Sequence, residues 1–129
     1  MTWRTLTLIV LPARLAVCQL PADAPAPVLP EGADLLACIR TADELTVVCS
    51  EALTPAGARV EGGWRALMLR GPLDLSLVGV LAELSNSLAQ AGVSIFVLST
   101  FNTDYILVKE DCLEAAQQAL RQGGCVVEG

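Results

Sequence analysis

Two short segments of the sequence carry groups that could hold a charged small molecule. A helix is expected over residues 75–91, and its first N–H groups, near Leu77, Val78 and Gly79, should favour an anion because they lack intrahelical partners and carry the positive end of the helix dipole. Gly79 has no side chain, which allows a close approach to the backbone. Asp104 lies in the second segment, where its carboxylate could accept an ammonium group or a cationic side chain.

The second segment offers further groups beside this carboxylate. Ser99 and Thr100 contribute hydroxyls, and Phe101 could form a wall against an apolar part of a ligand.

Each of these residues also has a purely structural interpretation. Asp104 could be a solvated turn residue, and Thr100 a β-branched strand residue. Phe101 could cover a hydrophobic edge without any ligand. Gly79 could serve close packing of a helix on a sheet.

The composition argues against catalysis. There is no histidine, which removes the commonest general base and the commonest metal ligand. Gly62-Gly63 is not followed by the lysine of a phosphate-binding loop. The five cysteines lack a C-x-x-C pair, which is typical of small buried thiols in a reduced, cytoplasmic protein. We therefore expect no enzyme, no catalytic residue, no cofactor and no metal site.

The charge balance and the hydropathy pattern exclude other classes. The net charge is −6 and no basic run exists, which argues against nucleic acid and anionic membranes as partners. The apolar run of residues 6–11 is short and ends at Pro12, so we expect neither a signal peptide nor a membrane helix.

The elements that must position these groups are clearest after residue 63. Apolar residues recur at three- and four-residue steps over 75–91, with Asp74 or Ser76 as caps and Gly92 as the end. A second helix should begin at Asp111, with Glu114 completing a capping box, and end at Gly123-Gly124. Strands are expected at residues 64–70, 93–100, 104–109 and 125–127.

This order, β-α-β-β-α-β, predicts an α+β, ferredoxin-like fold with two helices on one face of a four-stranded antiparallel sheet. Such a sheet has an open face, on which Phe96 and Leu98 would meet water. We therefore expect a homodimer or a larger symmetric assembly, or coverage by the rest of the chain.

The chain also shows a tandem repeat. Trp3 and Trp64 open similar segments (64 − 3 = 61), Thr41 and Thr100 open similar hairpins (100 − 41 = 59), and an almost constant lag indicates duplication. We predict a degenerate unit over residues 1–60 and a complete one over 61–129.

In the degenerate repeat the first helix is replaced. A strand is expected over residues 14–20, an extended loop over the proline-rich residues 21–31, and a strand pair around residues 41–48. Residues 51–63 should be a linker with at most one helical turn. Glu44 stands where Asp104 stands in the other repeat, in a hairpin that is one residue shorter.

The duplication, the element order and the hairpin give the sequence a resemblance to the ACT-domain family, and in particular to its small two-unit branch that includes the arginine-sensing CASTOR proteins. Residues 71–81 resemble the strand-to-helix ligand loop of the family, and residues 99–108 resemble its hairpin. The resemblance implies a regulatory protein that holds a free amino acid at an interface between units or subunits. It implies these binding residues: Ser76, Leu77, Val78, Gly79, Val80, Ser99, Thr100, Phe101 and Asp104.

Two functions remain open. The first is an amino-acid sensor that passes its signal to a separate protein. The second is an interaction module that uses ACT-like sheets only for assembly and binds no small molecule.

Overall fold

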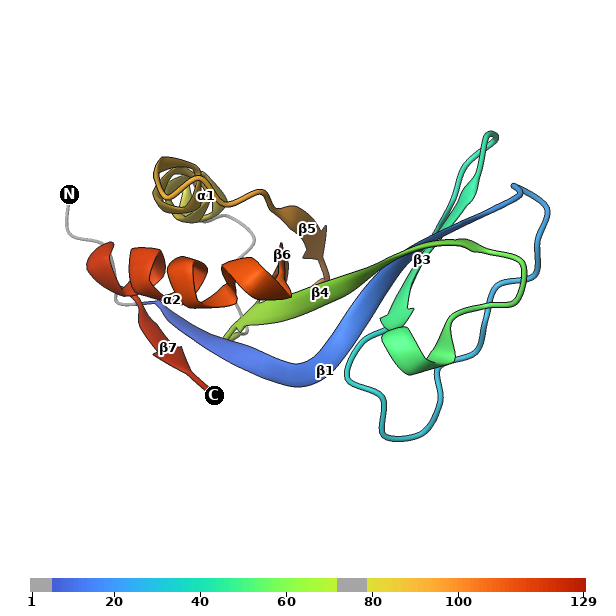
Figure 1. Ribbon diagram of the computed structural model, residues 1–129, viewed down its shortest axis with the longest axis horizontal. Helices are drawn as coiled ribbons and strands as arrows, with labels where there is room; N and C mark the ends of the chain where they lie inside the picture. The colour runs from blue at the N-terminus through green and yellow to red at the C-terminus, as the bar shows by residue number, and fades with distance from the viewer. Residues whose placement is uncertain (1–5, 72–78) are drawn as a thin grey trace. The chain divides into compact units, whose positions relative to one another are not determined.

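The structure is a computed structural model that describes residues 6–71 and 79–129 (Figure 1). The chain divides into two compact units. One, the helical unit, contains the described residues up to Pro12 and those from Arg65 onward. The other, the β unit, is Ala13–Trp64. The predicted repeats at 1–60 and 61–129 concern descent from a duplicated segment. The division into compact units does not test that prediction.

The second half of the chain has the predicted β-α-β-β-α-β order. The strands and helices follow each other as β4, α1, β5, β6, α2 and β7, so the α+β prediction is confirmed. Their bounds are Arg59–Leu69, Val80–Gln90, Phe96–Ser99, Asp104–Lys109, Leu113–Gln122 and Val126–Glu128.

The sheet of the helical unit differs from the expected four antiparallel strands. Strand β1, Thr7–Leu20, lies between β4 and β7, which gives the order β7-β1-β4-β6-β5. The pairing of β7 with β1 is parallel, and Thr7 lies opposite Val126. This parallel pair makes the sheet mixed. It arises because an early segment of the chain, β1, provides one of the inner strands.

Both helices bury their apolar stripes against one face of this sheet. Leu84 and Leu88 of α1 and Leu120 of α2 are 0–1% exposed. They pack with aliphatic side chains of the strands, among them Leu67, Leu69, Ile106 and Val108. This cluster is the hydrophobic core that fixes both helices on the sheet.

The ends of the helices correct several sequence predictions. The described helix α1 begins at Val80 with Gly79 as its N-cap and no side-chain capping bond. Asp74 and Ser76, the predicted caps, lie outside the described residues. The predicted end is confirmed: Gly92 has φ +75°, and Val93 N–H bonds to Leu88 C=O, as in a Schellman motif.

The capping box predicted for the second helix is wrong. Residues Glu110–Cys112 form a short 3₁₀ turn that leads into α2, and neither start has a side-chain capping bond. Asp111 lies inside this turn and not at the helix boundary. The end near Gly123-Gly124 is as predicted.

The β unit contains no α-helix. Its strand order is β2-β3-β1-β4, with β2 at Ala37–Arg40 and β3 at Leu45–Ser50, which confirms the predicted strand pair. Residues 21–36 form a loop, and a 3₁₀ turn at Glu51–Leu53 precedes β4. The unit has its own buried cluster: Ala16, Cys18, Leu20, Leu45, Val47 and Cys49.

Strand β4 begins earlier than the sequence suggested, at Arg59 instead of residue 64. Gly62 and Gly63, read as part of a linker, lie inside this strand, and Gly63 has φ +78°. The Glu51 carboxylate accepts the Gly63 N–H at 2.7 Å and lies 3.6 Å from the Arg14 guanidinium. The first contact fastens the 3₁₀ turn to β4, which follows it, and the second fastens it to β1.

Pro12 does not break β1, although we expected separate strands on its two sides. The edge of β1 pairs with β7 over residues 7–9 and with β3 over residues 15–20. Pro12 falls between these two paired stretches, so its missing N–H removes no bond from the ladders with β7 and β3, on the edge of β1 opposite β4.

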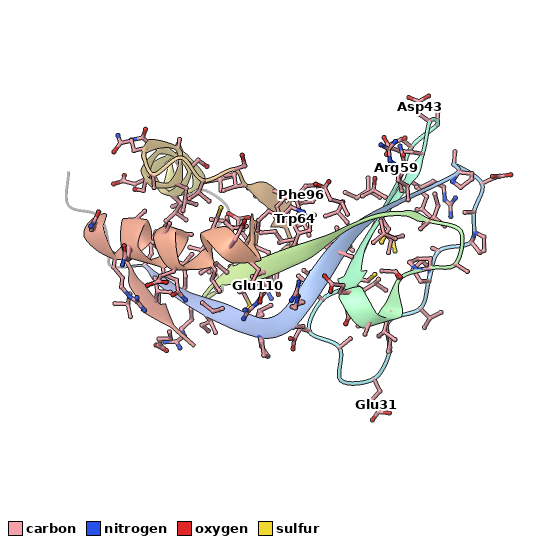
Figure 2. All side chains as sticks on the ribbon, in the orientation of Figure 1. Glu31, Asp43, Arg59, Trp64, Phe96 and Glu110 are labelled. Carbon is pink, nitrogen blue, oxygen red and sulfur yellow. The ribbon has the colours of Figure 1, made fainter. Side chains whose placement is uncertain are left out.

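Phe96 and Leu98, expected on the open face, are covered within the single chain, which is one of the two alternatives expected for them. Leu98 is 9% exposed, and Phe96, labelled in Figure 2, is half-buried. Leu107, which lies opposite Phe96 in the β5–β6 pair, is fully buried. These side chains therefore need no second subunit to leave water.

All five cysteines are free thiols. Burial, with a smaller contribution from the neighbouring Cys18, raises the pKa of Cys49 from 9.0 to about 11. Burial also raises the pKa of Cys18. Both lie in the β unit, where Cys38 is exposed.

We predict that the β unit loses stability above about pH 9, because an unfolded thiol ionises there while folded Cys49 stays protonated up to about pH 11. Below pH 9 both states are protonated, and this contribution is fully present. The urea midpoint at about pH 10 should therefore lie below that at about pH 8, and by less in Cys49→Ala. An equal decrease in both proteins would contradict the assignment to Cys49.

None of the helices in the described part of the chain is long and apolar enough to cross a membrane.

Candidate functional site

The hairpin between β5 and β6 positions the candidate carboxylate. Ser99 ends β5, Asp104 begins β6, and the two residues lie opposite each other in the register. The Ser99 hydroxyl donates a hydrogen bond to Asp104 Oδ1 at 2.6 Å. The structure thus brings these two predicted residues together and gives the carboxylate a fixed direction, with accepting capacity beyond this one bond.

Thr100 shapes the turn. Its N–H donates to the Thr103 carbonyl at 2.8 Å, and its hydroxyl oxygen accepts the Thr103 N–H at 3.2 Å. Thr100 lies outside β5, so the interpretation as a strand residue is wrong. Its hydroxyl holds a tight four-residue turn and has a structural partner already.

Thr103 is the residue that the sequence analysis missed. Its hydroxyl donates to the Leu69 carbonyl at 2.5 Å, at the end of β4. This bond fastens the hairpin turn to the strand that leads into the segment before α1. The signal in the sequence was weak, because a threonine in a turn is common and nothing marked its distant partner.

We predict that Thr103→Val lowers the free energy of unfolding of the helical unit by about 1 kcal/mol, since the Leu69 carbonyl loses its donor. Thr103→Ser keeps the hydroxyl and serves as the control. Chemical denaturation followed by circular dichroism measures both. A loss in Thr103→Ser with none in Thr103→Val would show that the methyl group, and not the hydroxyl, matters.

At the other candidate segment, Gly79 occupies the N-cap of α1 with φ +83°. This left-handed conformation strains any residue with a Cβ, so glycine is required by the backbone there. Val80 is 7% exposed and belongs to the core, so only its backbone can face a ligand. Ser76, Leu77 and Val78 lie outside the described residues.

Phe101 lies at the tip of the hairpin and is 82% exposed. It therefore does not cover a hydrophobic edge within the described chain, which removes the structural interpretation. An aromatic ring left in water next to the Ser99–Asp104 pair is available to a ligand or a partner.

The hairpin of the β unit shows why Glu44 is no counterpart of Asp104. Its turn is also four residues long, with the Thr41 N–H bonded to the Glu44 carbonyl at 2.9 Å. Glu44 thus matches Thr103, and the strand residue that matches Asp104 is Leu45, which is 1% exposed. The expected shorter hairpin is wrong, and this hairpin lacks a carboxylate at that position.

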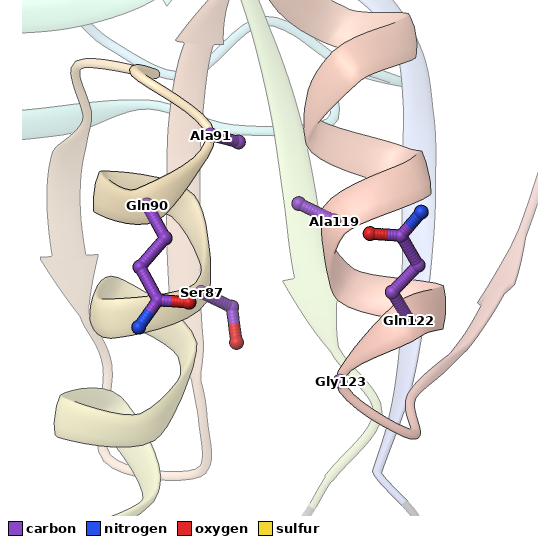
Figure 3. Close-up of a pocket in the computed structure, with 6 residues that line it drawn as sticks. All are labelled: Ser87, Gln90, Ala91, Ala119, Gln122 and Gly123. Atoms are coloured by element: carbon purple, nitrogen blue, oxygen red, sulfur yellow. The ribbon is translucent and has the colours of Figure 1, made fainter.

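A separate groove of about 350 Å³ lies between the C-terminal turns of α1 and α2 (Figure 3). Its lining is Ser87, Gln90, Ala91, Ala119, Gln122 and Gly123, which includes no predicted binding residue. No group of three or more His, Cys, Asp and Glu side chains in the described residues could hold a metal ion.

The matches to known proteins agree with the fold and with the hairpin. Residues 59–122 match the ACT-domain family, and this range includes the start of α1 and the whole β5–β6 hairpin. The matched range therefore contains every described residue of the candidate site.

A curated relative, the human protein named "Cytosolic arginine sensor for mTORC1 subunit 1", is 35% identical over 60 residues. The match covers 46% of this chain and only 18% of the relative. The bovine protein of the same name matches equally.

Solved structures extend the likeness over almost the whole chain. A protein from Agrobacterium tumefaciens has a TM-score of 0.87 at 29% identity and covers 97% of this chain and 93% of its own. The regulatory subunit of aspartate kinase from Thermus thermophilus has a TM-score of 0.67 at 11% identity, covering 90% of this chain and 95% of its own. The second likeness shows a shared fold alone.

Proposed function

We propose that this protein is a regulatory sensor that binds a free amino acid at its ACT domain. The observation that carries the proposal is the Asp104 carboxylate, held at 2.6 Å by Ser99 on a hairpin that Thr103 fastens to the end of β4. This carboxylate would accept the ligand's ammonium group or a cationic side chain. The backbone at Gly79 and Val80, at the N-terminus of α1, would favour the ligand's carboxylate.

The comparisons support the class of ligand. ACT domains are regulatory modules, and the curated relatives bear the name of an arginine sensor. We propose that the predicted loop residues Ser76, Leu77 and Val78 complete the site and that Phe101 closes over the ligand. Holding an amino acid at this site requires charge partners and hydrogen bonds but no catalytic group. We therefore propose a binding protein and not an enzyme.

We propose further that the protein is cytoplasmic, descends from a tandem duplication and assembles as a homodimer. Free thiols at all five cysteines favour a reducing compartment, as does the printed name of the human relative. Light scattering at micromolar concentration tests the assembly, and a monomer would refute the dimer.

A thermal-shift screen of the purified protein against the twenty amino acids at millimolar concentration tests the sensor. A ligand that binds only the native state raises the melting temperature by an amount set by its concentration over its dissociation constant. A shift with one amino acid or a few related ones is expected. A flat panel would refute the sensor and favour the interaction module, for which the exposed Phe101 is the best contact.

A further inference from the structure

The loop of residues 21–36 occupies a position where helices usually occur. Strands β1 and β2 both pair antiparallel with β3, so they run parallel to each other. Parallel strands need a crossover connection, and the usual crossover is an α-helix. This crossover contains neither helix nor strand. Loops of such length without secondary structure are uncommon in compact domains and often carry function.

Proline fixes the conformation of the middle of this loop, residues 24–30, which we name the proline segment. Pro25, Pro27 and Pro30 have φ near −65° by ring closure, and the residue before each one is confined to extended or polyproline II conformations. Val28 alone escapes both constraints, and no described residue other than glycine has a positive φ. The segment is therefore a preformed, extended peptide.

One end of the proline segment is fastened to β2. The Arg40 guanidinium donates to the Ala22 carbonyl and, at 2.7 Å, to the Ala24 carbonyl. At the other end, the Ala33 N–H donates to the Pro30 carbonyl at 3.2 Å, which closes a turn within the loop itself. The segment is thus anchored at its start and ends in a turn.

Some residues of the loop pack against the core, while two apolar residues in the middle of the proline segment are exposed. Ala24 and Leu36 pack against the buried cluster of the β unit. Val28 is 87% exposed and Leu29 is 51% exposed. Single apolar residues on a surface are ordinary. Two adjacent ones on a stiff segment, with no role in the core, form a contact surface ready for a partner.

The charged side chains of the loop itself are all acidic, and the cation beside it, Arg40, lies at the start of the segment. Asp23, Glu31 and Asp34 are exposed, and residues 21–36 contain no lysine or arginine. Glu31 lies at the outer bend of the loop (Figure 2). A partner that binds here should therefore carry a basic rim.

We propose that the proline segment is a docking peptide for a partner protein that has an aromatic-lined groove with a basic rim. Pro27-Val28-Leu29-Pro30 has the P-x-x-P spacing that such grooves recognise in polyproline II peptides. The prolines reduce the entropy lost on binding, and the two exposed apolar side chains supply the contact. The amino-acid site plays no part in this interaction.

The test begins with a photo-crosslinking phenylalanine derivative at Val28 of the full chain, in cells of its source organism. A discrete protein adduct is expected at position 28. The control carries the same derivative at Ala56, an exposed residue of another loop, and should give at most about a tenth of the adduct yield at position 28. The absence of an adduct specific to position 28 would overturn the proposal. An adduct with a second copy of this chain would overturn it as well.

The partner identified by mass spectrometry is then purified and titrated with the full chain. Pro27→Ala and Val28→Ser should each weaken binding about tenfold, added salt should weaken it further, and Pro55→Ala, outside the segment, should leave it unchanged. A synthetic peptide of residues 22–33 should compete. Binding that is insensitive to both variants and to the peptide would refute the docking role. Circular dichroism excludes misfolding of the variants.

Discussion

Leu120→Ala is expected to lower the free energy of unfolding of the helical unit by about 3 kcal/mol. Leu120 is 0% exposed and lies on α2 in the core cluster, where truncation costs the transfer free energy of three carbon atoms and leaves a cavity. Because both described α-helices belong to the helical unit, far-ultraviolet circular dichroism during urea titration reports on this unit.

The control is Gln118→Ala, an exposed position on the same helix, which should change stability by no more than about 0.5 kcal/mol. If Leu120→Ala unfolds at the same urea concentration as the control, the core described between α2 and the sheet is incorrect.

Asp104→Asn is expected to weaken binding of the effector found in the thermal-shift screen by about tenfold to a hundredfold. Asparagine keeps an oxygen that can accept the Ser99 hydroxyl, so the hairpin should persist while the negative charge disappears. Hydrogen bonds to charged groups contribute about 1.5–3 kcal/mol, which corresponds to this loss. Isothermal titration calorimetry gives the affinity directly.

Asp43→Asn makes the same change of charge at the tip of the other hairpin (Figure 2) and should bind the effector like the unaltered protein. Equal affinity in Asp104→Asn would leave Asp104 as a turn residue and refute its role as the ligand's charge partner. A parallel loss in both variants would point to the net charge of the protein and not to the hairpin.

Local patterns in the sequence were sufficient for most of the helical unit. The stripe through Leu84 and Leu88, the stop at Gly92 and the hairpin around Asp104 all depend on residues close together in the chain. The insertion of β1 beside β7 could not be read in this way, because strand pairing across the whole chain leaves no local signal. The continuity of β1 through Pro12 could not be predicted for the same reason. It depends on where β7 and β3 pair with β1, and local sequence does not show those positions.

The candidate site was predictable in part. Ser99 and Asp104 were expected on one hairpin, and the glycine at position 79 has a backbone reason. The expected turn of residues 101–103 would have placed Thr100 opposite Asp104, whereas the observed four-residue turn places Ser99 there. The bond from Thr103 to Leu69 joins residues far apart in the sequence, so no local residue spacing could predict it. Glu44 was misplaced because charge similarity guided the alignment of the two hairpins, while hydrogen bonds show that Leu45 takes that position.

The position of β1 between β4 and β7 also sets the order in which the chain can fold. Thr7 pairs with Val126, a separation of 126 − 7 = 119 residues, so this ladder requires closure of a very long loop. During synthesis, the β1 residues that pair with β7 must wait until β7 has emerged, and until then one side of their backbone lacks its strand partner. The β unit, whose strands lie close together in sequence, can form much earlier. A chain truncated before β7 would therefore lose the partner of one of its earliest strands.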